Sequence, residues 1–131
     1  MTETEYRDNV MDVGWFLFQY SKSAARGNDI WSVRMLTNVV HHLGRVLLYR
    51  YAPERAKLGL KTIEQSLPES VVVELTEILE FITPGEHEQA VGRIGRLLER
   101  EYDWIRLQWS EESEQMRFVR MMIDRYVGGN E

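Results

Sequence analysis

Four polar side chains that could bind an anion recur at helical spacing within an otherwise apolar segment. They are Arg34, Asn38, His41 and Arg45. On a helix, positions i, i+4, i+7 and i+11 line up along one side, and we call this row the polar ridge. Two guanidinium groups beside an imidazole suit an anionic ligand, and they equally suit acidic side chains of a neighbouring helix. The ridge is therefore a candidate ligand-binding or ion-pairing surface.

The segment that carries the ridge, residues 29–53, is predicted to be one helix. Apolar side chains cover its other two sides at helical spacing: Val33, Leu36, Val40, Leu43, Leu47 and Tyr51 on one, and Trp31, Met35, Val39, Val46 and Tyr49 on the other. Such a helix is the central element of a bundle. His41 lies on the ridge, where ligand contact and plain packing are equally open. His42 lies about 100° further round the helix and is predicted to be buried and hydrogen-bonded.

Glu101 is an acidic side chain in an unfavourable place. It falls between Leu97 and Ile105 in the apolar stripe of a helix predicted over residues 86–109. An unpaired carboxylate would be costly there. We expect Glu101 to pair with Arg34 or Arg45 of the ridge, and the alternative is a functional carboxylate.

The fragment Glu86-His87-Glu88 contains residue types that ligate metals. Neighbours on a helix point in different directions, so these three side chains cannot converge on one ion. We interpret the fragment as a solvated helix start, with its acidic residues near the positive end of the helix dipole. The sequence therefore predicts no metal site.

The remaining chain is also predicted to be helical, with Pro53, Pro68 and Pro84 between the periodic segments. The predicted helices cover residues 4–25, 29–53, 54–66, 71–82 and 86–109, with a final helix that begins after a Ser110 cap. Gly27 suits a left-handed C-cap of the first helix, and Asp29 suits an N-cap of the second. We predict one all-α domain over residues 1–131, an antiparallel up-and-down bundle of five or six helices.

The composition narrows the class of protein. The chain has 131 residues, 44% of them hydrophobic and 28% charged, and it contains no cysteine. No apolar run approaches the roughly 20 residues that span a bilayer, so we expect no membrane association and a cytoplasmic location. The net charge of −5 argues against general binding to nucleic-acid phosphates.

The first predicted helix has more apolar surface than one small bundle can cover. From Trp15 to Tyr20 it is apolar round its whole circumference except at Gln19. Excess apolar surface of this kind marks an interaction site. We therefore expect a partner chain to bury it, and a homodimer is the simplest case.

The order of segments from residue 18 to residue 109 resembles a known family. A long apolar helix is followed by LGLKTIEQSLPES and then by VVELTEILEFITPGEHEQAVGRIGRLLEREYDWIRLQW. This resembles the helical C-terminal, substrate-binding domain of kanamycin (aminoglycoside) nucleotidyltransferases and related stand-alone substrate-binding subunits. The resemblance implies that the nucleotide, the Mg²⁺ ion and the carboxylates that bind it belong to a separate small nucleotidyltransferase subunit.

The same resemblance bears on the first helix. In the family, a glutamate there looks like the general base, and the segment FLFQYSK places Gln19 at or near that position. An amide cannot accept the proton, so the resemblance implies a domain that binds and assembles and does not catalyse alone. Lys22 could retain an electrostatic role towards phosphate.

Two other functions stay open. Arg34 and His41 enclose six residues, which fits the Arg-x4–6-His pattern of helical ribonuclease toxins of the "higher eukaryotes and prokaryotes nucleotide-binding" class. In that case His41 would act as general acid or base, Arg34 would steady the phosphate, RNA would be the substrate, and a toxin–antitoxin pair would be expected. The third possibility is a dimeric scaffold without a small ligand.

Overall fold

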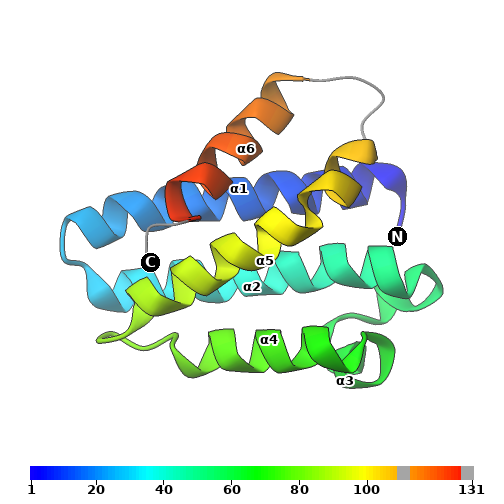
Figure 1. The fold of residues 1–131 in the computed structure, drawn as a ribbon, viewed down its shortest axis with the longest axis horizontal. Helices are drawn as coiled ribbons and strands as arrows, with labels where there is room; N and C mark the ends of the chain where they lie inside the picture. The colour runs from blue at the N-terminus through cyan, green and yellow to red at the C-terminus, as the bar shows by residue number, and fades with distance from the viewer. Residues whose placement is uncertain (109–112, 128–131) are drawn as a thin grey trace.

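The computed structural model describes residues 1–108 and 113–127, and it confirms that this part of the chain is all-α (Figure 1). The helices in chain order are α1 (Glu3–Ala25), α2 (Asp29–Tyr51), the 3₁₀ helices η1 (Pro53–Leu58) and η2 (Leu60–Thr62), α3 (Ile63–Ser66), α4 (Glu69–Glu80), α5 (His87–Leu107) and α6 (Glu114–Tyr126). Over the described ranges there is no strand. None of the described helices is long and apolar enough to cross a membrane.

The first two helices form an antiparallel hairpin. The turn between them uses Gly27 at φ 71°, which confirms the predicted left-handed C-cap. Near the turn, the hydroxyl groups of Ser23 and Ser32 lie 2.7 Å apart. At the other end of the hairpin, the rings of Tyr6 and Tyr49 stack with their centroids 4.6 Å apart. These two contacts fix which residues of α1 and α2 lie at the same height.

Two predicted element boundaries are wrong. The helix predicted over residues 54–66 is broken into η1, η2 and α3, because Gly59 adopts φ 83° and interrupts the helical path. Asp29 is the first residue of α2, and the N-cap position belongs to Asn28, which makes no side-chain capping bond. The predicted Ser110 cap lies outside the described residues. The described cap of α6 is Ser113, whose hydroxyl accepts a hydrogen bond from the Met116 amide.

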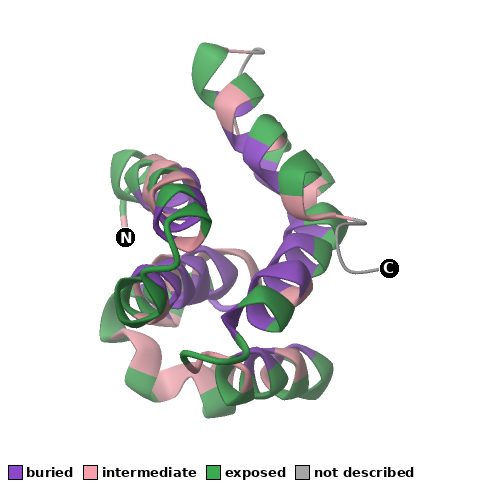
Figure 2. Cartoon of the chain, turned by 90° about the vertical axis from the view of Figure 1, so that its left-hand side faces the viewer, coloured by how far each residue is buried: buried purple, intermediate pink, exposed green. Residues whose placement is uncertain are grey.

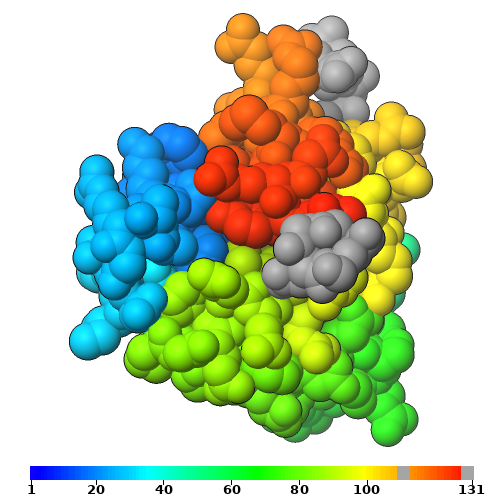
Figure 3. All heavy atoms as spheres, turned by 60° about the vertical axis from the view of Figure 1, so that its left-hand side comes forward, coloured from blue at the N-terminus to red at the C-terminus, as the bar shows by residue number. Residues whose placement is uncertain are grey.

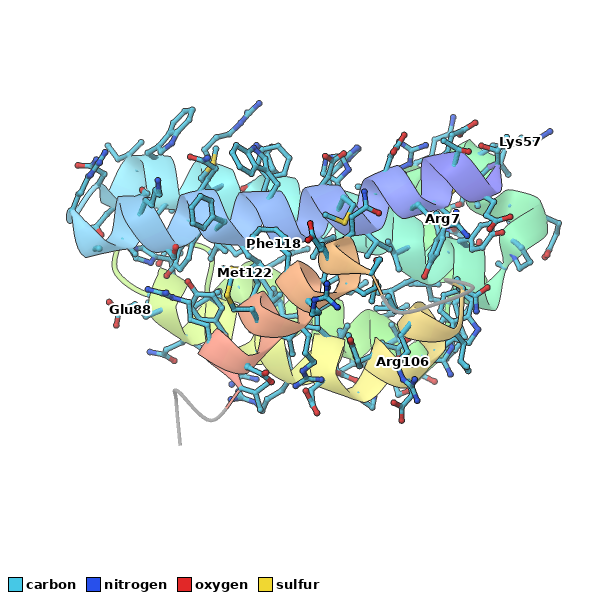
Figure 4. The ribbon with its side chains drawn as sticks, turned by 90° about the horizontal axis from the view of Figure 1, so that it is seen from above. Arg7, Lys57, Glu88, Arg106, Phe118 and Met122 are labelled. Atoms are coloured by element: carbon cyan, nitrogen blue, oxygen red, sulfur yellow. The ribbon has the colours of Figure 1, made fainter. Side chains whose placement is uncertain are left out.

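The other helices pack against one side of the hairpin. Figure 2 shows α1 and α2 on one side of the molecule, α5 and α6 on the other, and α4 beside α5. The buried apolar side chains form one connected cluster between these elements. In Figure 4, Phe118 and Met122 of α6 lie against α1. The opposite side of the α1–α2 hairpin is not covered by α4, α5 or α6.

Candidate functional site

The polar ridge lies on the uncovered side of α2. Arg34 and His41 are exposed, and Asn38 and Arg45 are partly buried, while residues on the other side of α2, such as Leu43, are fully buried. None of the four ridge side chains forms a hydrogen bond or ion pair with another described residue, although the His41 ring meets the His42 ring edge-on. The ridge is therefore open to solvent or to a partner.

Glu101 is buried as its position in the apolar stripe indicates, but its predicted partners are wrong. Its side chain is only 2% exposed. Arg50 donates to Oε1 at 2.8 Å and the Tyr51 hydroxyl donates to Oε2 at 3.1 Å. The end of α2 brings Arg50 and Tyr51 next to α5, whereas Arg34 and Arg45 lie on the uncovered side of α2. The buried carboxylate thus ties α2 to α5 and stands apart from the polar ridge.

His42 is hydrogen-bonded at the α1–α2 contact, as predicted, but it is only partly buried, with 19% of its side chain exposed. Its Nδ1 atom lies 2.8 Å from Oδ1 of Asn9, and its ring stacks on Phe16 at a centroid distance of 5.5 Å. Asp12 lies 3.6 Å away, and the His41 ring meets the His42 ring edge-on. Burial lowers the pKa of His42, and only Asp12 among these neighbours opposes that effect. The imidazole therefore favours its neutral form.

A second row of outward residues runs along α1 beside the polar ridge. It consists of Asp8, Asp12, Trp15 and Gln19, which have the same i, i+4, i+7, i+11 spacing as the ridge. We call it the α1 row. Trp15 is 49% exposed and Asp12 is 46% exposed. Together the α1 row and the polar ridge form the outer face of the hairpin. The spacing of these four residues in the sequence is enough to predict that they form one row.

The apolar surface predicted around Trp15 is covered in part by the chain itself. Phe16 packs on His42, and Phe18 meets Phe118 of α6 at a centroid distance of 6.2 Å. Lys22 is exposed, and its Nζ atom lies 4.7 Å from the centre of the Phe18 ring. Trp15 alone among the large apolar residues of this stretch stays strongly exposed.

His87 is not the solvated residue that its neighbours suggest. It is 4% exposed, and its Nε2 atom lies 2.8 Å from the Asp29 carboxylate while its Nδ1 atom lies 2.7 Å from the Tyr20 hydroxyl. A carboxylate only accepts hydrogen bonds, so in the neutral ring Nε2–H donates to Asp29 and Nδ1 accepts from Tyr20. Burial raises the pKa of Tyr20, which keeps the phenol protonated. The three residues join α1, α2 and α5 at one end of the molecule.

Three hollows surround this end of the molecule, which Figure 3 shows with the end of α1 in blue, the start of α5 in yellow-green and the end of α6 in red. One of about 340 Å³ lies where the end of α1, the start of α5 and the end of α6 meet, and Tyr20, Glu88 and Arg125 are among its lining residues. Figure 4 shows Glu88 at this end of α5. A second, of about 520 Å³, lies beside the turn and is lined by Gly27, Asn28, Asp29, Ile30, Trp31 and Pro84. A third, of about 350 Å³, lies over the 84–89 segment and Asp29.

Several buried polar side chains of the molecule are already paired. Tyr20, His87 and Glu101 already have internal hydrogen-bond partners. No three His, Cys, Asp or Glu side chains in the described ranges are grouped so that they could hold a metal ion. Compared with protein-family models, with curated proteins and with solved structures, the chain matches none.

Proposed function

We propose that this chain is a non-catalytic substrate-binding and assembly domain that works beside a separate small nucleotidyltransferase subunit. The resemblance of residues 18–109 to the helical domain of that family supports the choice of partner. Nucleotide and Mg²⁺ would be bound by the partner. The chain itself would supply a helical bundle that holds the complex together and presents the substrate.

The observation that carries the assembly role is the apolar surface at the hairpin turn. Ile30 is 81% exposed and Trp31 is 56% exposed, in the first turn of α2. Both line the 520 Å³ hollow beside Pro84. Exposed aromatic and aliphatic side chains next to a hollow are the usual anchors of protein–protein interfaces. We assign this end of the hairpin to the partner subunit.

The experiment uses the full chain and the purified product of the neighbouring open reading frame, if that frame encodes a small nucleotidyltransferase. Light scattering after size exclusion should show a complex, and Trp31→Ala should weaken it at least about tenfold, because a tryptophan that anchors an interface commonly contributes about 2 kcal/mol or more and about 1.4 kcal/mol is tenfold in affinity. Met121→Ala is the matched control, since Met121 is also 56% exposed but lies on α6. A complex that ignores Trp31→Ala, or no complex at all, contradicts the proposal.

Ribonuclease activity is the second candidate, favoured by one observation. Arg34 and His41 are both exposed on the same side of α2 and neither is tied to a described acidic residue. An accessible imidazole beside a guanidinium can move a proton and steady a phosphate. If RNA is cleaved, His41→Ala should reduce the rate at least about 100-fold, the usual scale of general acid–base catalysis. Cleavage that persists in His41→Ala removes this candidate.

A further inference from the structure

We propose that the outer face of the α1–α2 hairpin is covered by a second copy of this chain, with α1 of each copy lying along α2 of the other. This deepens the assembly role proposed above, on which it rests, by naming the occupant of one surface. The partner subunit was assigned to the hairpin turn, whereas the second copy would occupy the middle of the hairpin. Three properties of the face lead to this occupant.

The first property is charge. The α1 row carries two carboxylates, Asp8 and Asp12, and the polar ridge carries the guanidinium groups of Arg34 and Arg45. The two signs lie in separate parallel rows on one surface. A two-fold axis that runs between the rows, along the hairpin, places the acidic row of each copy over the basic row of the other. The face is thus complementary to itself.

The second property is the register of the two rows. The Tyr6–Tyr49 stack and the Ser23–Ser32 hydrogen bond each join two residues that lie at the same height along the hairpin, one on α1 and one on α2. With this register, Arg45 lies at a height between Asp8 and Asp12. Rotation about a two-fold axis that runs along the hairpin does not change the height of any residue. Arg45 of one copy therefore lies at a height between Asp8 and Asp12 of the other copy as well. The guanidinium of each Arg45 would therefore sit between two carboxylates of the other chain.

The same register continues along the rows. His41 lies at a height between Asp12 and Trp15, and Asn38 lies between Trp15 and Gln19. Trp15, 49% exposed, would thus enter a gap between two ridge side chains near the centre of the interface. A central aromatic anchor surrounded by polar groups is the common pattern of a protein interface.

The third property is area. Each helix of the hairpin has 23 residues. Two such helices are each about 34 Å long and about 10 Å wide, and without the one turn left to the partner subunit their outer face covers about 570 Å². Stable interfaces bury about 800 Å² on each partner. The face is therefore close to the lower limit of that class, about 600 Å² on each partner.

The test is a charge reversal on each row, read by sedimentation velocity over a range of concentrations. The wild-type chain should be a dimer. Asp12→Arg and Arg45→Asp should each raise the dimer dissociation constant at least about 100-fold, because each homodimer then contains two pairs of like charges.

An equimolar mixture of the two variants should form a heterodimer. One of its two contacts joins the arginine introduced at position 12 to the aspartate introduced at position 45. The other contact joins the native Arg45 of the first variant to the native Asp12 of the second. Both contacts pair opposite charges, and only an intermolecular pairing of these two rows predicts this rescue.

Controls separate the interface from folding. Asp103→Arg makes the same charge change at an 89% exposed site on α5 and should leave the dimer intact. Because Asp12 contacts His42, Asp8→Arg is the second variant if Asp12→Arg melts early by circular dichroism. A monomeric wild type, dimeric single variants, or a mixture without heterodimer would each overturn the proposal. Trp31→Ala should remain dimeric and Asp12→Arg should still bind the partner subunit, so this inference and the proposed function can fail independently.

Discussion

The hydroxyl of Tyr20 lies 2.7 Å from Nδ1 of His87, and this contact links the end of α1 to the first turn of α5. Tyr20→Phe removes the donor and leaves a buried imidazole nitrogen without its partner. We expect the free energy of unfolding to fall by about 1–3 kcal/mol, the cost of an unsatisfied buried polar group. Urea unfolding measures this change.

Tyr49→Phe is the control for that substitution. The Tyr49 ring stacks on Tyr6 and is only partly buried, and phenylalanine keeps that stacking. Its unfolding midpoint should stay within the error of the wild type. Equal losses in Tyr20→Phe and Tyr49→Phe would show that the Tyr20–His87 hydrogen bond contributes nothing specific.

The Arg50–Glu101 pair should contribute more to the free energy of unfolding than the surface ion pairs do. Arg50→Met leaves Glu101 buried with the Tyr51 hydroxyl and a more distant Arg100, whose Nε atom is 3.6 Å away. Removing one partner of a buried pair costs about 3 kcal/mol or more. Chemical unfolding should show this loss, and Glu101→Gln combined with Arg50→Met should recover part of it, because the uncompensated charge is gone.

The control for this pair is Arg106→Met. Arg106 pairs with Asp103 at 3.4 Å on the exposed side of α5. Exposed pairs contribute about 0–1 kcal/mol. If Arg106→Met and Arg50→Met destabilise the protein equally, the burial of Glu101 does not set the strength of its pair.

The sequence could predict those parts of the fold that depend on local pattern. The helical periodicity predicts most of α1, α2, α4 and α5, and Gly27 marks the turn because few other residues adopt a positive φ. The structure of the 54–66 segment is harder to predict, since only Gly59 indicates three short helices in place of one continuous helix. The burial of Glu101 can also be predicted from the sequence, because its position between the apolar residues of one helix face depends only on local spacing.

The partners of the polar residues could not be predicted in this way. Tyr20 and His87 are 67 positions apart, and nothing in either local pattern says which helix ends will meet. Several arginines of α2 and α5 could in principle pair with Glu101. Arg50 is its partner because of the way α2 and α5 cross, which the sequence does not specify. The α1 row is different, because its spacing repeats that of the polar ridge and was visible in the sequence alone.

The pKa of His42 predicts how stability depends on pH. Burial lowers this pKa in the folded state, so below pH of about 6.5 the unfolded chain binds the proton more readily. Stability is therefore complete above that pH and decreases as the pH falls through it. Binding of one full proton would change the free energy of unfolding by about 1.4 kcal/mol per pH unit. The slope expected here is smaller, because the ring is partly exposed.

Thermal melts of His42→Asn and His41→Asn across this pH range check the assignment. His42→Asn should flatten the dependence, since the partly buried titrating group is gone. His41→Asn should keep most of it, because burial, the largest cause of the lowered His42 pKa, remains when the smaller contribution of His41 is removed. A dependence that survives in His42→Asn would assign it to another group.

Two glycines test how closely the helices approach. A Cβ atom at Gly95 of α5 would lie 2.9 Å from Cβ and 3.1 Å from the carbonyl carbon of Tyr126, so backbone at the end of α6 must move. A Cβ atom at Gly44 of α2 would overlap Cδ2 of Leu60, which is the far end of a flexible side chain. We expect Gly95→Ala to cost about 1–3 kcal/mol by overpacking, and Gly44→Ala to cost less because Leu60 can change rotamer.

Hydrogen exchange distinguishes the two substitutions beyond their stability. Gly95→Ala should raise exchange at the end of α6, because the contact that holds Tyr126 against α5 is pushed apart. Gly44→Ala should leave exchange in α6 unchanged and raise it, if anywhere, around η2. Equal protection of α6 in Gly95→Ala and wild type would mean that α6 does not depend on its close approach to Gly95.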